Sequence, residues 1–181
     1  MALGSTIYKI DINLSNFNTH YYESFNLTIA KHPSENESRM MYRLLAFLYC
    51  AHIDLKFTKG LSRTEEPELW QKDYTGEIIQ WIELGLPDTK RIRQASGKSL
   101  AVKVFTYHQN KAHEWYQNNK YDFQKNKKLE VYHFNVSENG PIDKFVVKSM
   151  RLSCIIEEQQ MYLSDDSERI GIEVKKLDNI N

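Results

Sequence analysis

The fold is decided by the stretch EIIQWIELGLPDTKRIRQASGKSLAVKVFTY, residues 77–107. Within it, residues 78–84 carry apolar side chains on both faces of a strand, with Ile79 and Trp81 on one face and Ile82 on the other. A strand that is apolar on both faces is typical of a sheet covered on both sides. We therefore predict that residues 78–84 form the central strand of such a sheet.

The residues after this strand predict a helix and a second strand. Gly85 and Pro87 end the first strand, and Asp88 can cap a short basic helix that runs to Ala95. Residues 100–107 then resume a strand pattern. A strand, a helix and a strand in this order form a β-α-β unit, whose two strands pair in parallel.

Further helices and strands are predicted around this unit. Pro33, Ser34 as N-cap and Glu37 three residues later predict a helix that ends near His52, and a shorter helix is predicted at 111–118. Strands are predicted at residues 8–14, 25–29, 55–57, 129–134, 152–156, 161–163 and 170–174. Together these elements predict an α/β (α+β) fold with a mixed β-sheet and packed helices.

The chain shows no linker, repeat or low-complexity segment, so we predict a single domain over residues 1–181. A polar stretch at 60–76 is long enough to be a functional loop or an irregular excursion. Cys50 and Cys154 form no metal-binding or redox pair in sequence, and no window is long and apolar enough to span a membrane. We therefore expect a cytoplasmic protein that does not associate with membranes.

The net charge is zero, but the charges are unevenly distributed. Residues 54–88 hold eight acidic and four basic side chains, whereas residues 90–128 hold ten basic and two acidic ones. A metal-assisted enzyme that acts on a phosphate polymer would use an acidic region beside a basic one. Two solvated faces of opposite sign would give the same count, so the pattern alone does not decide.

Aromatic residues interleave with lysines in the basic segment Lys90 to Lys128, which could bind nucleic acid by stacking and phosphate contacts. The same aromatics serve equally well as core, and we expect them to be core because burial is the usual reason for a tryptophan. These aromatic residues are Tyr107, Trp115, Tyr116, Tyr121 and Phe123.

Glu83 is the clearest candidate for a functional residue. It shares a strand face with Ile79 and Trp81, which places a carboxylate at the end of an apolar ribbon. Such a group must be paired or bound to metal, or its pKa must rise, because desolvating an unpaired charge costs several kcal/mol. Mg²⁺ usually takes one or two carboxylates and keeps several waters, so a second acid, Glu68 or Asp73, would complete a site for Mg²⁺ or Mn²⁺.

Each candidate ligand also has a structural explanation. Glu83 could form a buried ion pair with Arg39, Arg43 or Arg91. Asp73 precedes Tyr74-Thr75-Gly76, a sequence typical of a turn. A third metal ligand could come from Glu35, although an acid near a helix start is also stabilised by the helix dipole.

Ordered motifs occur along nearly the whole chain: MAL-x-x-TIYK, HPSE-x-x-x-RMM-x-RLLAF, FTKGL, EPELW, DYTG, WIELGLPD-x-x-R-I-R-x-A and LSDD. In these segments the chain resembles the YaeQ family of small bacterial proteins. The resemblance implies a restriction-endonuclease-like core, as in the PD-(D/E)XK nucleases, with additional antiparallel strands.

In nucleases of this kind a helix acid, an acid after proline and a strand E-x-K hold metal and activate water. Carried onto matching positions, Glu35 is the helix acid, Pro67-Glu68 is the equivalent of PD, and Glu83 is the acid of E-x-K. The lysine is absent, because Leu84 and Gly85 follow Glu83.

A cation from elsewhere could replace this lysine. The candidates are Lys90 and Arg91 in the predicted basic helix, with Arg93 and Lys103 as further possibilities. An arginine could stabilise phosphate charge but could not act as a base, because it is permanently protonated.

Two functions follow as hypotheses. The first is a magnesium-dependent nuclease or phosphodiesterase that uses Glu68 and Glu83, with Glu35 or Asp73, as metal ligands. The second is a catalytically inactive module with the same fold that binds a protein partner or nucleic acid. The missing lysine keeps the second hypothesis open.

Overall fold

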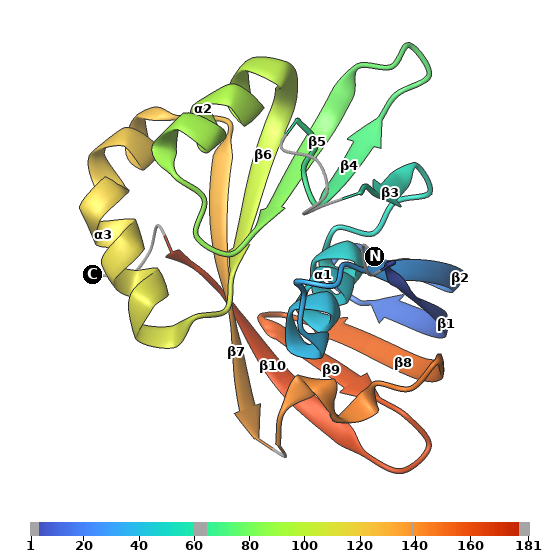
Figure 1. Ribbon diagram of the computed structural model, residues 1–181. Coiled ribbons are helices and arrows are strands. Elements are labelled where there is room, and N and C mark those ends of the chain that lie inside the picture. Colours follow the sequence, from blue (N-terminus) through green and yellow to red (C-terminus); the bar gives the residue numbers. More distant parts are fainter. Residues whose placement is uncertain (1–3, 60–64, 139, 178–181) are drawn as a thin grey trace. The chain divides into compact units, whose positions relative to one another are not determined.

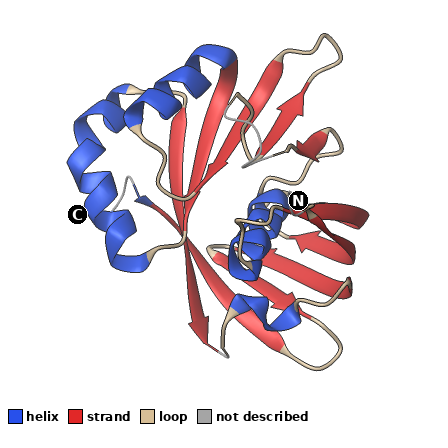
Figure 2. Ribbon diagram, viewed as in Figure 1, coloured by secondary structure: helices blue, strands red, loops and turns tan. Residues whose placement is uncertain are grey.

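A computed structural model describes residues 4–59, 65–138 and 140–177 of the chain (Figure 1). These residues form ten β-strands, three α-helices and one short 3-10 helix, so the fold is mixed α+β as predicted (Figure 2). None of the helices in this described part is long and apolar enough to cross a membrane.

The chain divides into two compact units. Unit 1 contains Met1–Tyr49 and Asn135–Val174, and unit 2 contains Cys50–Phe134 and Lys175–Asn181. The two boundaries near the C-terminal half fall within strand β7 and close to the end of strand β10. All of the acidic and basic residues from 54 to 128 discussed above therefore belong to unit 2.

Unit 1 is built on a sheet in the strand order β2-β1-β8-β9-β10. Strand β1 pairs antiparallel with β2 and parallel with β8. Along β1 the apolar residues Ile10, Ile12 and Leu14 are buried while the residues between them are mostly exposed, as the alternation predicted. The strands are β1 Thr6–Asn16, β2 Tyr21–Lys31, β8 Ser149–Glu157, β9 Gln160–Ser164 and β10 Arg169–Lys176.

Helix α1, Glu37–Tyr49, buries most of its apolar residues and packs against strand β2 of this sheet. Phe47 packs edge-on against Phe25 of β2, with 5.2 Å between ring centroids. The Ser38 hydroxyl donates to Asp143 in the 3-10 helix Ile142–Phe145, at 2.9 Å.

The start of α1 corrects one prediction. Helix α1 begins at Glu37, and the side chain of Asn36, not Ser34, accepts the backbone N–H of Arg39 at 2.8 Å. Glu37 does not close a capping box on Ser34. Its carboxylate instead accepts the hydroxyl of Tyr8 at 3.3 Å. Both Ser34 and Asn36 are residue types that can cap a helix, and in the structure the cap is Asn36, directly before Glu37.

Unit 2 is built on the strand order β7-β6-β5-β4-β3. Strands β5, β6 and β7 are parallel, and β3 and β4 extend the sheet antiparallel from β5. The elements are β3 Leu55–Phe57, β4 Leu69–Lys72, β5 Ile78–Leu84, α2 Thr89–Lys98, β6 Ser99–Thr106, α3 Gln109–Lys125 and β7 Leu129–Glu138.

The β-α-β unit predicted from residues 77–107 is confirmed. Asp88 caps α2 by accepting the backbone N–H of Arg91 at 2.7 Å, and β5 pairs in parallel with β6. Helices α2 and α3 cover the face of β5 that carries Trp81. The core on this face consists of Trp81, Ile92, Ala95, Val102, Val104, Tyr116, Phe123, Val131 and Leu177.

The polar stretch at 60–76 differs from its prediction, because it contains a strand. Residues 60–64 lie outside the described residues, but β4 follows them and pairs with β5 through Leu69 and Ile82. The stretch lacks clear alternation, so its pairing comes from the neighbouring strand and not from its own pattern. Helix α3 is also longer than the predicted 111–118, because residues with weak periodicity flank its apolar centre.

The cap of α1 gives a first prediction. Replacing Asn36 by alanine should lower the free energy of unfolding by about 1 kcal/mol, because one backbone N–H loses its acceptor. Urea denaturation followed by circular dichroism measures this change. Ser34→Ala is the matched control and should have no effect larger than a few tenths of a kcal/mol. An equal loss in both variants would contradict the assignment.

Candidate functional site

The carboxylate of Glu83 lies on the helix-covered face of unit 2, near the end of β5. Glu83 is only 6% exposed. Two donors meet at one of its oxygens: Trp81 Nε1 donates to Oε1 at 2.6 Å, and Arg91 Nε donates to the same atom at 2.7 Å. Both distances are short, as expected for hydrogen bonds to an ionised acceptor.

Arg91 lies in the first turn of α2 and contacts three residues of unit 2: Glu83, Glu66 and Trp81. Besides Glu83 Oε1, it donates through Nη2 to the backbone carbonyl of Glu66. Its guanidinium also lies over the ring of Trp81, 5.3 Å from the centroid. Because Asp88 fixes the start of α2, the capped helix presents Arg91 toward β5.

Glu68 lies beside Glu83. It directly precedes Leu69, which pairs with Ile82, and its negative charge acts on the Glu83 carboxyl, so the two acids lie near each other at this end of the hairpin. The backbone N–H of Glu68 also donates to the carbonyl of Ile82 at 3.0 Å. Like Glu83, Glu68 is only 6% exposed. The structure thus brings together the two acids that the sequence proposed as the centre of a site.

The pKa of the Glu83 carboxyl is raised above its ordinary value, chiefly because burial disfavours the charged form. The hydrogen bond from Trp81 and the positive charge of Arg91 lower this pKa, whereas the negative charge of Glu68 raises it. At this carboxylate the effect of burial therefore outweighs that of the two donors.

The other proposed acids have hydrogen-bond partners of their own. Glu35 belongs to unit 1, where Arg39 Nη1 binds its Oε1 at 2.8 Å and Arg43 Nη2 binds its Oε2 at 2.9 Å. Both oxygens of this buried carboxylate therefore face guanidinium groups of its own unit. Arg43 also donates to the carbonyl of Ala30, which fixes α1 to β2.

Asp73 lies in the turn between β4 and β5, at the other end of the hairpin from Glu83. Its Oδ1 accepts the backbone N–H groups of Thr75 and Glu77 and the Thr75 hydroxyl. The hydroxyl hydrogen bond is the largest cause of its lowered pKa. Five residues of extended strand separate Ile78, beside this turn, from Glu83, which is about 17 Å.

Of the cations that could replace the missing lysine, the structure places some near Glu83 and others away from it. Arg91 contacts Glu83, whereas Lys90 is exposed on α2 and its side chain makes no hydrogen bond or ion pair within the described residues. Lys103 pairs with Ile82 and Glu130 in the sheet, so its side chain projects from the face opposite Glu83. Of the candidates, Arg91 is thus the one beside the acids.

Gly85 occupies the position where the E-x-K pattern has its lysine. Its φ is +95°, and an added Cβ would meet no atom within 4 Å. Space is therefore available, but the left-handed backbone disfavours any residue with a side chain by roughly 1–2 kcal/mol. A lysine at this position would require a different strand end.

Trp81 is a site residue that the sequence argument treated only as core. Its indole N–H and the Glu83 carboxylate are two residues apart on one strand, and side chains with this spacing share a face. A tryptophan two residues before a buried acid is the signal that could have identified this donor.

The YaeQ protein family model matches residues 1–174, which include parts of both units. The chain belongs to the YaeQ family. It is 38% identical over 173 residues to the YaeQ protein of Escherichia coli (strain K12), covering 95% of each chain. It is 36% identical over 175 residues to YaeQ of Salmonella typhi, covering 96% of each chain.

Solved YaeQ structures have the same fold. The crystal structure of YaeQ from Xanthomonas axonopodis pv. citri superimposes with a TM-score of 0.90 at 30% identity, covering 95% of this chain and 97% of that one. YaeQ from Pseudomonas syringae gives a TM-score of 0.85 at 29% identity, covering 96% of both chains. The resemblance to the YaeQ family predicted from sequence motifs is thereby confirmed.

The charges around Glu83 give a second prediction. Arg91→Gln should raise the pKa of the Glu83 carboxyl, because a neighbouring positive charge is lost, and Glu68→Gln should lower it, because a neighbouring negative charge is lost. Carbon NMR titration of the glutamate carboxyls measures both shifts. Lys90→Gln is the control and should leave this pKa in place. Shifts of the same sign in the Arg91 and Glu68 variants would refute the arrangement.

The same arrangement makes stability depend on pH. An acid whose pKa is raised by folding stabilises the folded state fully at pH values below its pKa in the unfolded chain. This stabilisation is lost as the pH rises through its pKa in the folded protein. The stability of the protein relative to Glu83→Gln should therefore fall as pH rises from about 4.5, by at most about 1.4 kcal/mol per pH unit. Urea denaturation at several pH values measures the difference. If the stability of the wild type relative to Glu83→Gln increased with pH, the raised pKa of Glu83 would be contradicted.

Gly85 gives a further prediction. Gly85→Ala should destabilise the protein by about 1–2 kcal/mol, because alanine is strained at positive φ. Gly97 lies inside α2 without this strain, so Gly97→Ala should stabilise by about 0.5 kcal/mol. Thermal unfolding of both variants tests the pair. Stabilisation by Gly85→Ala would show that the strand end relaxes.

Proposed function

We propose that this YaeQ family member is a divalent-metal-dependent phosphodiester hydrolase of the nuclease type, with a variant PD-(D/E)XK site on a restriction-endonuclease-like core. The observation that carries the proposal is the closeness of two buried acids: the backbone N–H of Glu68 donates to the carbonyl of Ile82, the residue before Glu83, and Arg91 pairs with Glu83. Two buried acids and one cation, at the end of a central strand, match the chemistry that such a reaction needs.

The donor set suits magnesium or manganese. Both ions prefer carboxylate oxygens, and magnesium commonly uses one or two of them and retains several waters. Among the described residues there is no group of three or more His, Cys, Asp or Glu side chains that could hold a metal, so the ligands in this proposal are Glu68 and Glu83. A bound cation would favour the ionised form of Glu83, whose pKa is raised chiefly by burial and to a smaller extent by the charge of Glu68.

When bound, the metal would lower the pKa of a coordinated water and so supply a hydroxide nucleophile. The chain's own residues have separate tasks. Trp81 and Arg91 both donate to Oε1 of Glu83, so they orient its carboxylate and direct Oε2 away from their donors. Arg91 stabilises negative charge on the phosphate, and it does not act as a base.

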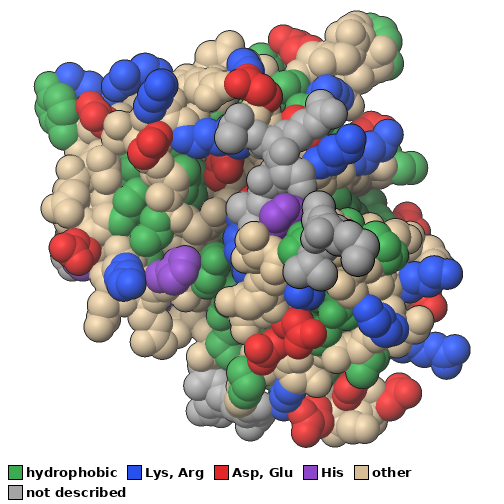
Figure 3. Space-filling view, in the orientation of Figure 1, with side chains coloured by type: hydrophobic (Ala, Val, Ile, Leu, Met, Phe, Trp, Pro, Cys, Tyr) green, Lys and Arg blue, Asp and Glu red, His purple; other side chains and the backbone are tan. Residues whose placement is uncertain are grey.

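The basic segment Lys90 to Lys128 would receive a nucleic-acid substrate. Helices α2 and α3 carry much of it, and Figure 3 shows blue basic side chains over this region together with green apolar ones. The core explanation for its aromatics is confirmed for Tyr116 and Phe123, which are buried. Tyr121 is 71% exposed, with the Lys125 ammonium over one face of its ring, so the other face would stack on a base.

Titration calorimetry with MnCl₂ or MgCl₂ tests the proposal. The wild type should bind one ion, and Glu83→Gln or Glu68→Gln should weaken binding at least about tenfold, because one of two carboxylate ligands is lost. Glu65→Gln is the matched control, since Glu65 is an exposed acid that pairs with Lys98. Cleavage of a labelled oligonucleotide should require the same metal. Absence of binding heat in the wild type would remove the metal site.

One observation favours a second candidate function. Arg91 already forms a direct ion pair with Glu83, and the lysine position is a left-handed glycine. A nuclease fold that has lost catalysis and binds nucleic acid or a protein partner would retain this ion pair for stability. Salt-dependent nucleic-acid binding without metal binding or cleavage would support this function over the first.

A further inference from the structure

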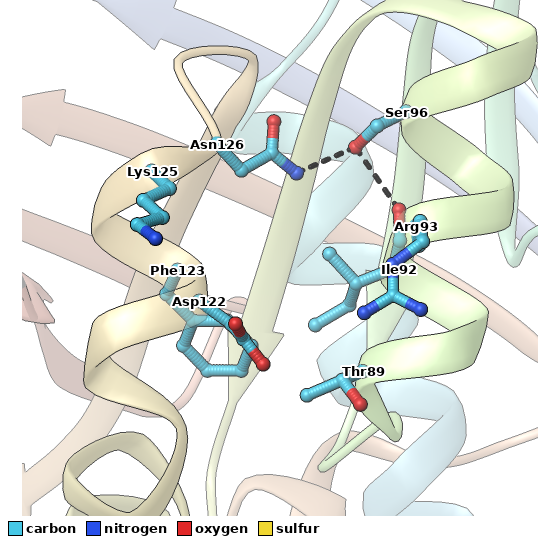
Figure 4. Close-up of a pocket in the computed structure, with 8 residues that line it drawn as sticks. All are labelled: Thr89, Ile92, Arg93, Ser96, Asp122, Phe123, Lys125 and Asn126. Atoms are coloured by element: carbon cyan, nitrogen blue, oxygen red, sulfur yellow. Dashed lines mark hydrogen bonds between the residues drawn. The ribbon is translucent and has the colours of Figure 1, made fainter.

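Unit 2 contains a cleft between helices α2 and α3 that lies apart from the Glu83 site. Its volume is about 310 Å³, and it is lined by one side of α2 and by the last turn of α3 (Figure 4). A cavity of this size is at the lower end of the range for small-molecule sites. Arg91 and Arg93 are two residues apart on α2, so they project in nearly opposite directions, Arg91 toward Glu83 and Arg93 into the cleft.

The floor of the cleft is apolar. Ile92 from α2 and Phe123 from α3 are core residues, 3% and 6% exposed, and they present only edges of their side chains to the cleft. In Figure 4 the two side chains extend toward each other from the facing helices. An aromatic ring and an aliphatic side chain in this arrangement suit a flat apolar group.

One end of the cleft is fixed by hydrogen bonds between the helices. Asn126 Nδ2 donates to Ser96 Oγ at 2.7 Å, and Ser96 Oγ donates to the carbonyl of Ile92 at 3.0 Å (Figure 4). This chain of bonds joins the C-terminal end of α3 to α2. The spacing between the helices is therefore set before any ligand arrives, which lowers the free-energy cost of binding.

The rim of the cleft carries an excess of positive charge. Arg93 and Lys125 are basic and Asp122 is acidic, so the three rim groups sum to one positive charge. The side chains of Arg93 and Asp122 make no ion pair with each other or with any other described residue. Both therefore remain available to a ligand, Arg93 as a donor to an anion and Asp122 as an acceptor.

We propose that this cleft binds a nucleotide unit. The base covers the exposed edges of Ile92 and Phe123, and the phosphate contacts Arg93. Lys125, whose ammonium donates to the Tyr121 hydroxyl, turns to the phosphate when it binds, and Asp122 accepts a hydrogen bond from the sugar or from an exocyclic amine. A planar ring attached to an anion fits both the apolar floor and the net charge, whereas a purely apolar ligand would leave Arg93 and Asp122 unused. The nucleotide is either free or one unit of a nucleic-acid chain, and only the latter source rests on the proposed function.

Titration with adenosine 5′-monophosphate, followed by two-dimensional NMR in EDTA, tests the cleft without any metal. Amide signals of Ile92, Ser96 and Phe123 should shift, and Arg93→Gln should weaken binding at least about tenfold, because a charge-assisted hydrogen bond is lost. Lys125→Gln is a second variant and should also weaken binding. Lys111→Gln, which removes an exposed charge from α3 outside the cleft, is the matched control and should bind as the wild type does.

Two further ligands distinguish the possible sources. A ten-residue oligodeoxyadenylate that binds at least about tenfold more tightly than the mononucleotide, and loses this affinity in Arg93→Gln, identifies a unit of a nucleic-acid chain. Equal affinities identify the free nucleotide. Inorganic phosphate that reproduces the whole set of shifts at the same affinity would overturn the proposal, because the base would then contribute nothing. Shifts confined to residues outside the cleft would also overturn it.

Glu83→Gln separates this inference from the proposed hydrolase. This variant should bind adenosine 5′-monophosphate as the wild type does, since Glu83 lies outside the cleft. If metal binding fails in the wild type while the cleft signals shift, the hydrolase is excluded and the nucleotide site stands. If metal binds and the cleft signals stay in place, the nucleotide site is excluded and the hydrolase stands.

Discussion

The need to compensate a buried carboxylate at the end of strand β5 governs the arrangement of unit 2. Glu83 is almost fully withdrawn from water, so its charge requires donors within the protein. Trp81 supplies one from the same strand, and Arg91 supplies the other from the helix that follows. Because Arg91 also binds the carbonyl of Glu66, one guanidinium links β5, α2 and the segment that leads into β4.

The two units compensate their buried acids in different ways. In unit 1, Glu35 faces two arginines, one on each carboxylate oxygen, so its charge is fully matched. In unit 2, Glu83 receives donors from Trp81 and Arg91, and burial still raises the pKa of its carboxyl, with a smaller contribution from the negative charge of Glu68. Perturbed pKa values of buried acids occur at functional sites as well as in structural ion pairs, so the candidate site is built on Glu83 in unit 2.

Helix α2 connects the candidate site with the cleft. Its N-cap, Asp88, sets the start of the helix, and from there Arg91 and Arg93 project to opposite sides. One arginine faces the paired acids and the other faces α3 across the cleft. One short basic helix thus places residues two positions apart at the proposed hydrolase site and at the proposed nucleotide cleft.

The sequence by itself determined the family and the β5-α2-β6 unit, because alternation, end signals and an N-cap act over a few residues. It also identified Glu83 as a buried acid, since a carboxylate within an apolar strand is visible without coordinates. It did not determine which arginine binds Glu83, because Arg39, Arg43 and Arg91 differ only in where the fold places them.

The tertiary structure alone decided the neighbours of Glu83. Glu68 comes near it only because β4 pairs with β5, and β4 lies in a polar stretch that lacks a strand pattern of its own. The φ of Gly85, which disfavours a lysine there, likewise depends on how the strand leaves the sheet. Contacts between residues far apart in sequence depend on pairing and packing across the whole unit, and no local pattern encodes them.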